Sequence, residues 1–521
     1  MNDRTISKRE RYFLIAASAV IFLLPFILVG IKENIFMDEA LSLTCTNLSP
    51  EEFQSIDGWS GTPDAFFTMI FGTSQPFQYR QVYLNATEDV HPPFYFFLLH
   101  TVSSFFPGRY SLLFPVVINA VFGVGILWMF HGILHLLIKG EEARMVCCLF
   151  LLVSAALWND LSFLRMYVMS GFFVTALTYL LLSLDQKPKY YKIRLFLIIF
   201  LGIMTHYHFL IYLFGIGVVY LIVLMRRREY DLIRESILVA VSGILLSVVS
   251  FPAIFRQILS SKRGVEAQVN ILELGTYPGR ILFFLRSFGE DFFGVGWFAA
   301  VVIVITGMIL IYLFRRGKER FHEKVLLVLF PQIFFFILVS LTVRFSSLRY
   351  MYPIYPMFLI LCCVVVYYTT VRIRGMERHS VKILAGFVLA ASLFSFFSNR
   401  FPHLYRGDAQ KREVLSGYRD LDCIYLYAEE GEYAALYADC EEVKLYKTLT
   451  VMKLYSDTSV NEDLAEKERL MIVIDDGWFY QSNDPAEVIR DFCEEHDLPA
   501  NVTEIGKFSN DTRTYLCSKG E

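Results

Sequence analysis

Long apolar runs alternate with short polar segments along the first 398 residues of the chain. Most of these runs approach or exceed the ~20 apolar residues that a helix needs to cross a bilayer. They lie at about 12–31, 111–138, 145–159, 166–184, 195–206, 207–225, 235–255, 295–314, 325–343, 351–371 and 380–398. The pattern predicts an all-α polytopic membrane domain over 1–398, with about eleven transmembrane helices. No small-residue cleavage site follows the first run, so we expect it to remain as the first span.

A shorter run, "PPFYFFLLHTVSSFF" at 92–106, is below the spanning length, and we expect it to be interfacial or re-entrant. Lysines and arginines gather in the short segments between the other runs, as they do in cytoplasmic loops. All of these clusters fall on one side of the membrane only if 92–106 does not cross. We therefore expect a cytoplasmic N-terminus, an extracytoplasmic C-terminus, and external loops at 32–110 and 256–293.

The character of the chain changes at residue 399, where acids begin to outnumber bases. "DCIYLYA" and "RLMIVIDDG" are typical of buried strands, and "PAEVIRDFCEEH" of a helix that Asp484 caps. "EIGKFSNDTRTYLCS" is typical of a hairpin. The tail 399–521 is thus predicted to be a small extracytoplasmic α/β domain. Its four cysteines leave two disulfides or four free thiols equally open. These are Cys423, Cys440, Cys493 and Cys517.

Composition agrees with a membrane protein and excludes one class of partner. The chain is 55% hydrophobic and 19% charged, whereas soluble domains have about 25% charged residues. Its formal net charge of −3 gives no basic excess, so we expect no nucleic-acid partner.

Polar groups in apolar frames gather on the predicted external face. Asp38 and Glu39 follow the first span side by side. The others lie at the start of the short 92–106 run or at external ends of later spans: His91, Asp160, Arg165, Tyr167, His206, Tyr207, Arg344, Arg349 and Tyr350. Any one of them alone is more simply a solvated or snorkelling side chain. Their convergence on one face instead favours a site there.

These residues resemble the motifs of GT-C glycosyltransferases of the protein O-mannosyltransferase and aminoarabinose-transferase type. The resemblance runs to about residue 370 and rests on five short patterns in order. They are the acidic pair Asp38-Glu39, the His-Pro-Pro at His91, the Arg-x-Tyr of Arg165 and Tyr167, the Thr-His-Tyr of His206 and Tyr207, and the Arg-Tyr of Arg349 and Tyr350. The resemblance implies a membrane enzyme that transfers a sugar from a polyprenyl-phosphate carrier to an acceptor at the extracytoplasmic face.

The resemblance also implies roles. Asp38 would be the general base on the acceptor hydroxyl, and Glu39 would orient the acceptor or the base. Arg349 and Arg165, with Tyr350, would bind the donor phosphate, because guanidinium matches phosphate oxygens. His91, Asp160, Tyr167, His206 and Tyr207 would support them.

One departure from the family pattern concerns the second loop. Many relatives have an acid two residues before the arginine of that loop, where this chain has Phe163, and Asp160 is the nearest acid. Asp38, His91 and Asp160 could ligate a divalent metal, but they lack tight ligand spacing, so no cofactor is firmly predicted and a divalent metal stays open.

Two other functions remain open from the sequence. A polyprenyl-linked glycan polymerase or ligase would also act at this face, with its key arginines in large late loops. A transporter or flippase would instead place ionisable groups near the bilayer midplane. The middles of the spans here are nearly free of charge, which favours an enzyme. The sugar and the acceptor, whether protein, cell-wall glycan or lipid, cannot be inferred from the sequence.

Overall fold

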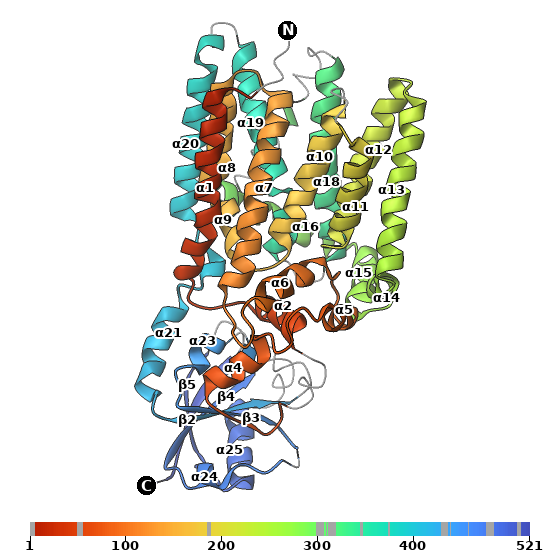
Figure 1. Ribbon diagram of the computed structural model, residues 1–521. Helices are drawn as coiled ribbons and strands as arrows, with labels where there is room; N and C mark the ends of the chain where they lie inside the picture. Colours follow the sequence, from red (N-terminus) through yellow and green to blue (C-terminus); the bar gives the residue numbers. More distant parts are fainter. Residues whose placement is uncertain are drawn as a thin grey trace. The chain divides into compact units, whose positions relative to one another are not determined.

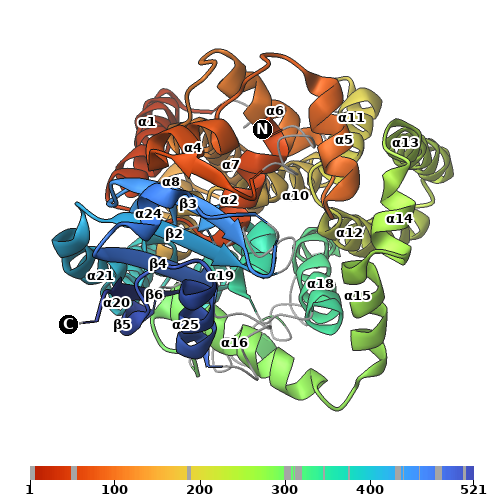
Figure 2. The same cartoon turned by 90° about the horizontal axis from the view of Figure 1, so that it is seen from below.

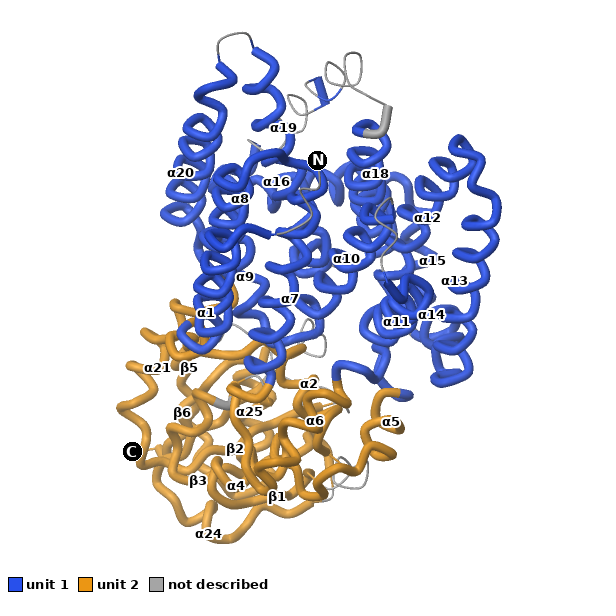
Figure 3. The backbone as a smooth tube through the Cα atoms, turned by 45° about the horizontal axis from the view of Figure 1, so that its top comes forward, with its two compact units in different colours: residues 1–27, 87–95, 115–401 blue, residues 28–86, 96–114, 402–521 orange. Residues whose placement is uncertain are grey.

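The protein folds into two compact units in the computed structural model (Figure 1). The structure describes residues 6–48, 56–184, 189–297, 307–308, 310, 319–343, 347–373, 376–428, 436–437, 439–456, 458–475, 484–507 and 512–520. Unit 1 contains residues 1–27, 87–95 and 115–401, and unit 2 contains residues 28–86, 96–114 and 402–521 (Figure 3). Each unit is therefore assembled from segments that are far apart in the sequence.

Unit 1 is a helical bundle whose helices follow the predicted apolar runs. Seven helical segments of the described chain are long and apolar enough to cross a membrane. They are Lys8–Gly30 (α1), Leu113–Leu137 (α7), His208–Arg226 (α12), Tyr230–Ser250 (α13), Phe321–Thr342 within α18 (Glu319–Thr342), Leu348–Arg372 (η2, Leu348–Ile354, and α19, Tyr355–Arg372) and Glu377–Ser398 (η3, Glu377–His379, and α20, Ser380–Ser398). The chain is thus a multi-pass membrane protein, as predicted.

The remaining predicted spans differ from the expectation of about eleven. Helices α8 (Glu141–Val153) and α9 (Ala155–Ser162) pass the same test as a pair but are bent by 49°. The bend lies at Ser154, whose extended backbone interrupts the helix. Helices α10 (Tyr167–Leu182) and α11 (Tyr191–Ile203) have only 16 and 13 residues. The predicted span 295–314 lies almost entirely outside the described residues.

Three further helices of unit 1 are α14 (Ala253–Leu259), α15 (Lys262–Leu272) and α16 (Tyr277–Phe293).

One end of the bundle holds buried or half-buried ion pairs near the predicted cytoplasmic clusters. Nε of Arg144 donates to Glu10 over 2.7 Å, and Nε of Arg227 donates to Glu323 over 3.0 Å. These pairs lie at the end of the bundle that carries the start of α1 and the end of α12 (Figure 1).

Unit 2 is built around a six-stranded mixed sheet with the order β1-β3-β2-β4-β6-β5. Its strands are β1 (Trp59–Gly61), β2 (Asp422–Tyr427), β3 (Thr448–Lys453), β4 (Arg469–Asp475), β5 (Asn501–Lys507) and β6 (Thr512–Ser518). β2 is parallel to β3 and β4, and the other pairs are antiparallel. Every residue of β2 is buried, because a central strand flanked by parallel partners is covered on both faces.

The predicted elements of the tail are confirmed. β2 and β4 are buried strands, and β5 and β6 pair as the predicted hairpin, with its turn outside the described residues. Helix α25 (Pro485–Glu495) is capped by Asp484, which accepts from the Ala486 amide over 3.1 Å. Ile489 and Phe492 of α25 belong to the same buried hydrophobic cluster as Ile472 of β4. The sheet also has two strands that the sequence analysis did not predict, β3 in the tail and β1 in the segment 32–110.

Unit 2 also contains helices and short 3₁₀ turns. It contains α2 (Met37–Asn47), α4 (Pro63–Phe71), most of α5 (Tyr79–Glu88) and of α6 (Phe94–Ser104), α21 (Asp408–Leu415), α23 (Cys440–Val443), α24 (Glu462–Ala465) and the short turns η4 (Pro402–Leu404) and η5 (Ser416–Tyr418). Helix α6 has only 11 residues, in keeping with a run too short to span. Cys423, Cys493 and Cys517 are free thiols, and the side chain of Cys440 lies outside the described residues.

The orientation in the membrane remains a prediction with a direct test. A reporter fused after residue 400 should report from the extracytoplasmic side, and one inserted within 226–234 should report from the cytoplasm. The reason is the one-sided distribution of lysine and arginine between the spans. Paired alkaline phosphatase and green fluorescent protein fusions measure this, and a cytoplasmic signal after residue 400 would contradict the predicted topology.

Candidate active site

The ten predicted site residues fall into two groups. Asp38 and Glu39 lie on α2 in unit 2, and the other eight lie in unit 1. Within unit 1, the junctions of helices bring seven of those eight into one cluster, while Asp160 lies elsewhere.

The acidic pair occupies the first turn of α2, where carboxylates are favoured by the helix dipole. Phe36 is the extended N-cap, and Glu39 at the third helical position accepts from its amide over 2.6 Å. Glu39 is 1% exposed and is held by the fully buried Nζ of Lys32 at 2.7 and 2.9 Å. Burial lowers the pKa of Lys32, and attraction to Glu39 opposes that shift. Glu39 is therefore a structural anchor of the helix, whereas Asp38 is half-buried at the start of α2.

The segment just before α2 is fastened to the C-terminal chain. Nδ2 of the buried Asn34 donates to Asp408 of α21 over 3.2 Å and to Glu442 of α23 over 3.1 Å. The Glu33 amide donates to the carbonyl of Leu404 over 2.8 Å, and the Glu33 carboxylate pairs with Arg412. The C-terminal domain thus sets the position of the helix that carries Asp38.

The cluster in unit 1 begins at the His-Pro-Pro segment. His91 Nδ1 lies 2.9 Å from Oδ2 of Asp89 and 3.4 Å from Nη2 of Arg165. Burial raises the pKa of Asp89, but His91 and then Arg165 lower it more, so the net pKa falls below its ordinary value. Asp89 is therefore ionised at neutral pH, and Nδ1 of His91 donates to it. Because Arg165 is only 3% exposed, this carboxylate compensates a charge that would be costly to bury alone.

Backbone contacts join this segment to the neighbouring junctions. The hydroxyl of Tyr95 donates to the carbonyl of Leu164, beside Arg165, over 3.1 Å. The amide of Phe94 donates to the carbonyl of Met204, at the end of α11, over 3.0 Å. The three loops that carry His91, Arg165 and His206 are thereby held together.

His206 is a buried, neutral hydrogen-bond donor. Burial lowers the pKa of His206 well below its ordinary value, and His208, His91 and Arg165 lower it further. Its Nδ1 accepts from the His208 amide over 3.1 Å, so the hydrogen of the neutral ring is on Nε2. Nε2 is buried and makes no hydrogen bond within the part of the chain that the structure describes. The ring centres of Tyr167 and His91 lie 5.3 and 5.6 Å from that of His206.

Arg349 and Tyr350 join the same cluster from η2. The ring of Tyr350 lies 5.6 Å from that of His208. The guanidinium of Arg349 lies 5.3 Å from the ring centre of Tyr350 and 5.9 Å from that of Phe163. Phe163 occupies the position at which the family pattern has an acid. In this chain its ring lies beside the guanidinium of Arg349 instead. Arg344 lies outside the described residues.

Asp160 belongs to a different buried group. It follows Asn159, whose Nδ2 donates to Asp291 over 2.7 Å, and the hydroxyl of Tyr355 also donates to Asp291 over 2.9 Å. Asp160 is 1% exposed, and its Oδ1 makes no hydrogen bond among the described residues. The structure thus places Asp160 beside Asp291 at the core of the bundle and not with His91.

The structure adds three residues to the unit 1 cluster that the sequence analysis did not predict as site residues. Asp89 precedes His91 by two positions in "EDVHPP", so its proximity was a usable signal. Gln257 of α14 accepts from the Tyr207 hydroxyl and donates to the carbonyl of Asp89 over 2.6 Å. Arg256 donates to the carbonyl of Thr87 and to Glu88. Nothing in the local sequence of α14 points to these contacts, because they join positions 50 to about 170 residues apart.

A metal does not fit the residues named for one. Among the described residues, no group of three histidine, cysteine or acidic side chains is arranged to hold an ion. Asp160 lies with Asp291, and His91 is hydrogen-bonded to Asp89, so they do not form a ligand set. We therefore derive no step through a metal.

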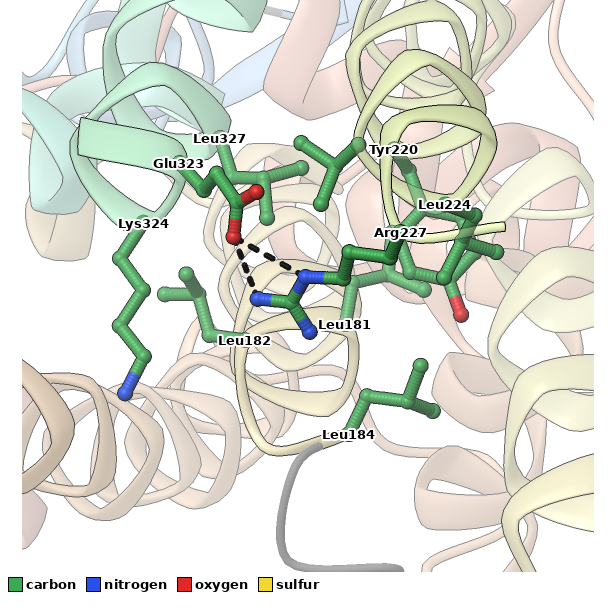
Figure 4. Close-up of a pocket in the computed structure, with 10 residues that line it drawn as sticks. Leu181, Leu182, Leu184, Tyr220, Leu224, Arg227, Glu323, Lys324 and Leu327 are labelled. Carbon is green, nitrogen blue, oxygen red and sulfur yellow. Dashed lines mark hydrogen bonds and ion pairs between the residues drawn. The ribbon is translucent and has the colours of Figure 1, made fainter. Parts of the chain in front are cut away.

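Two cavities lie apart from these groups. One, of about 20 Å³, lies between α10, α12 and α18, where Arg227 faces Glu323 and leucines line the wall (Figure 4). It has room for about one water molecule. The other is an open cleft of about 500 Å³ in unit 2, which includes Asp64, Thr68 and Ser74.

Comparisons with known proteins identify the fold. No protein-family model and no curated protein sequence matches the chain. The crystal structure of apo ArnT from Cupriavidus metallidurans is 12% identical, with a TM-score of 0.50 over 97% of this chain and 98% of that one. The same protein bound to undecaprenyl phosphate is 12% identical, with a TM-score of 0.51 over 96% and 97%. The apo oligosaccharyltransferase of Archaeoglobus fulgidus is 10% identical, with a TM-score of 0.42 over 94% and 69%. The chain therefore has the GT-C fold of ArnT, as its resemblance implied.

Proposed function

We propose that this protein is an inverting membrane glycosyltransferase that moves a sugar from a polyprenyl-phosphate donor to an acceptor at the extracytoplasmic face. The observation that carries the proposal is the cluster of buried and half-buried side chains at one end of the unit 1 bundle. There, Arg165 and the neutral donor His206 lie together beside Arg349 and Tyr350. Such a set of donors suits the oxygens of a phosphate at a membrane surface.

Each side chain of the cluster has a different role in binding the donor phosphate. The carboxylate of Asp89 balances the charge of Arg165, and His91 donates to that same carboxylate. His206 presents Nε2–H without adding a charge, because its pKa is too low for protonation at neutral pH. The guanidinium of Arg349 lies near the rings of Phe163 and Tyr350, which favour a cation at this position, and a guanidinium matches phosphate oxygens with two parallel hydrogen bonds. The ArnT structure with undecaprenyl phosphate supports a lipid phosphate as the ligand.

The acceptor side of the reaction is assigned to Asp38. In a single displacement, the acceptor oxygen bonds to the anomeric carbon while the bond from that carbon to the phosphate oxygen breaks. The hydroxyl proton passes to Asp38, and polyprenyl phosphate leaves with the electron pair. Glu39 already forms an ion pair with Lys32 and accepts a hydrogen bond from the Phe36 amide. It therefore orients α2 and is not a second base. The sugar is inverted because one displacement occurs.

Replacing Arg349 with lysine tests the phosphate assignment. Lysine keeps the charge and can reach the interface, but it cannot make a bidentate contact. Losing one charge-assisted hydrogen bond should weaken the binding of undecaprenyl phosphate about tenfold and slow transfer. Binding is measured on the full-length protein in detergent, with Arg490→Lys as a control, because Arg490 is exposed on α25. Wild-type affinity and rate in Arg349→Lys would move the phosphate away from Arg349.

A further inference from the structure

Helices α14 and α15 expose an unusual amount of apolar surface. On α14, Phe255 and Leu259 are 57% and 60% exposed. On α15, Val265, Val269 and Leu272 recur at intervals of four and three residues, and Leu272 is 80% exposed. Residues at this spacing lie on one face of a helix. An exposed apolar face of this kind marks an interaction surface.

The surface continues the lipid-facing side of a membrane span. Helix α13, which leads directly into α14, exposes Leu238, Leu245 and Val249, the last at 73%. Seen along the bundle, α13, α14 and α15 follow one another along the rim of unit 1, with α12 and α18 inside them (Figure 2). The inner side of α15 is fixed, because Nδ2 of Asn270 donates to the carbonyl of Thr342 of α18 over 3.2 Å. The apolar face therefore points away from the bundle.

The charges beside this face identify the kind of partner. Arg256 pairs with Glu88 at 3.0 Å, and Arg263 pairs with Glu266 at 3.2 Å. Both arginines are thus paired with acids, so the apolar side chains of this surface supply the main attraction to a membrane. It matches the boundary between headgroups and acyl chains, in which amphipathic helices lie parallel to the membrane.

We propose that the outward face of α14 and α15 is immersed in the bilayer leaflet at the site end of the bundle, and that this immersion holds the segment 87–91 in place. Two polar residues of α14 make the connection. Arg256 donates to the carbonyl of Thr87, and Gln257 donates to the carbonyl of Asp89. Lipid contact with a seven-residue helix thus stabilises the loop that carries His91.

The immersion is tested with spin labels on the full-length protein in donor-free phosphatidylcholine nanodiscs that hold one chain each. Labels are placed by Leu272→Cys, by Val249→Cys as the bilayer reference, and by Val414→Cys as the reference on α21 of the C-terminal domain. Val414 is 57% exposed. The wild-type protein gives the background of its native cysteines. The label at 272 should favour oxygen over a water-soluble nickel chelate as strongly as the label at 249.

Two results would overturn the immersion. A label at 272 that behaves like the one at 414 would place the surface in water. A label shielded from both reagents would place it against protein. These nanodiscs hold no second copy of the protein and no polyprenyl chain. Neither of them can therefore produce the accessibility to oxygen that is expected for lipid contact.

The link to the segment 87–91 has its own measurement. Val269→Asp combined with Leu272→Asp should drive the face out of the leaflet. Because α14 then loses hydrogen bonds to the loop, the amides of 87–91 should exchange hydrogen about tenfold faster. Val414→Asp, an identical change on α21, should leave their exchange unchanged. Unchanged exchange in the double variant would overturn the link, and neither measurement requires the proposed transfer activity.

Discussion

Replacing Asp38 with asparagine should abolish sugar transfer while leaving expression and the binding of polyprenyl phosphate nearly intact. Asparagine has the same shape but cannot accept a proton, and the loss of a general base lowers the rate by about 10²–10⁴-fold. Asp38 is half-buried and is not the residue that fixes α2, because Glu39 performs that task. The fold should therefore tolerate the change. The measurement is single-turnover transfer from purified donor lipid.

Two companion variants sharpen the assignment of Asp38. Asp64→Asn makes the same change at an exposed acid in the first turn of α4 and should turn over normally. Glu39→Gln keeps an oxygen that can accept from the Phe36 amide, but it leaves the buried Lys32 without its ion-pair partner. It should therefore loosen α2 and lower the rate, though by less than Asp38→Asn, which removes the base itself. Near-normal turnover in Asp38→Asn would show that another group accepts the proton.

Lys32→Met should destabilise α2 locally by about 3–5 kcal/mol, because it leaves the carboxylate of Glu39 buried without its ion-pair partner. Both side chains are almost fully buried, and Nζ lies within 2.9 Å of both carboxylate oxygens. Hydrogen exchange of the α2 amides in the full-length protein measures the free energy of local opening. The rate of transfer should fall as well, since Asp38 lies on the same turn.

The double variant Lys32→Met/Glu39→Gln separates the buried charge from the rest of the helix. Glutamine removes the unpaired charge but retains the acceptor for Phe36, so most of the lost stability should return. This recovery is expected because breaking a buried pair costs far more than replacing both partners. A double variant as unstable as Lys32→Met alone would mean that the ion pair itself, and not the stranded charge, stabilises α2.

Periodicity and length were sufficient for the elements of the tail. β2, β4, the β5–β6 hairpin and the Asp484-capped α25 all lie where the pattern of apolar residues and turn signals predicted them. The residues that decide such elements are neighbours along the chain. By contrast, β1 is a three-residue strand whose existence depends on pairing with β3, almost 400 positions away. No local pattern could predict it.

The same distinction applies to the candidate site. The sequence singled out His91, Arg165, His206 and Tyr350 by their polarity in apolar frames, and the structure brings them into one cluster. It also grouped Asp160 with them, although a bend at Ser154 and the packing of α16 place that side chain beside Asp291. The burial of Glu39 against Lys32 also became visible only in the fold.

The sequence by itself determined that this is a multi-pass membrane protein with a small α/β domain, because spanning length, hydrophobic periodicity and capping are local properties. Only the tertiary structure decided which charges are paired. Asp89 is ionised beside His91 and Arg165, Glu39 is locked to Lys32, and Gln257 reaches a loop about 170 residues away. The electrostatic state of a side chain depends on its burial and on its neighbours in space, and the order of residues along the chain does not fix either one.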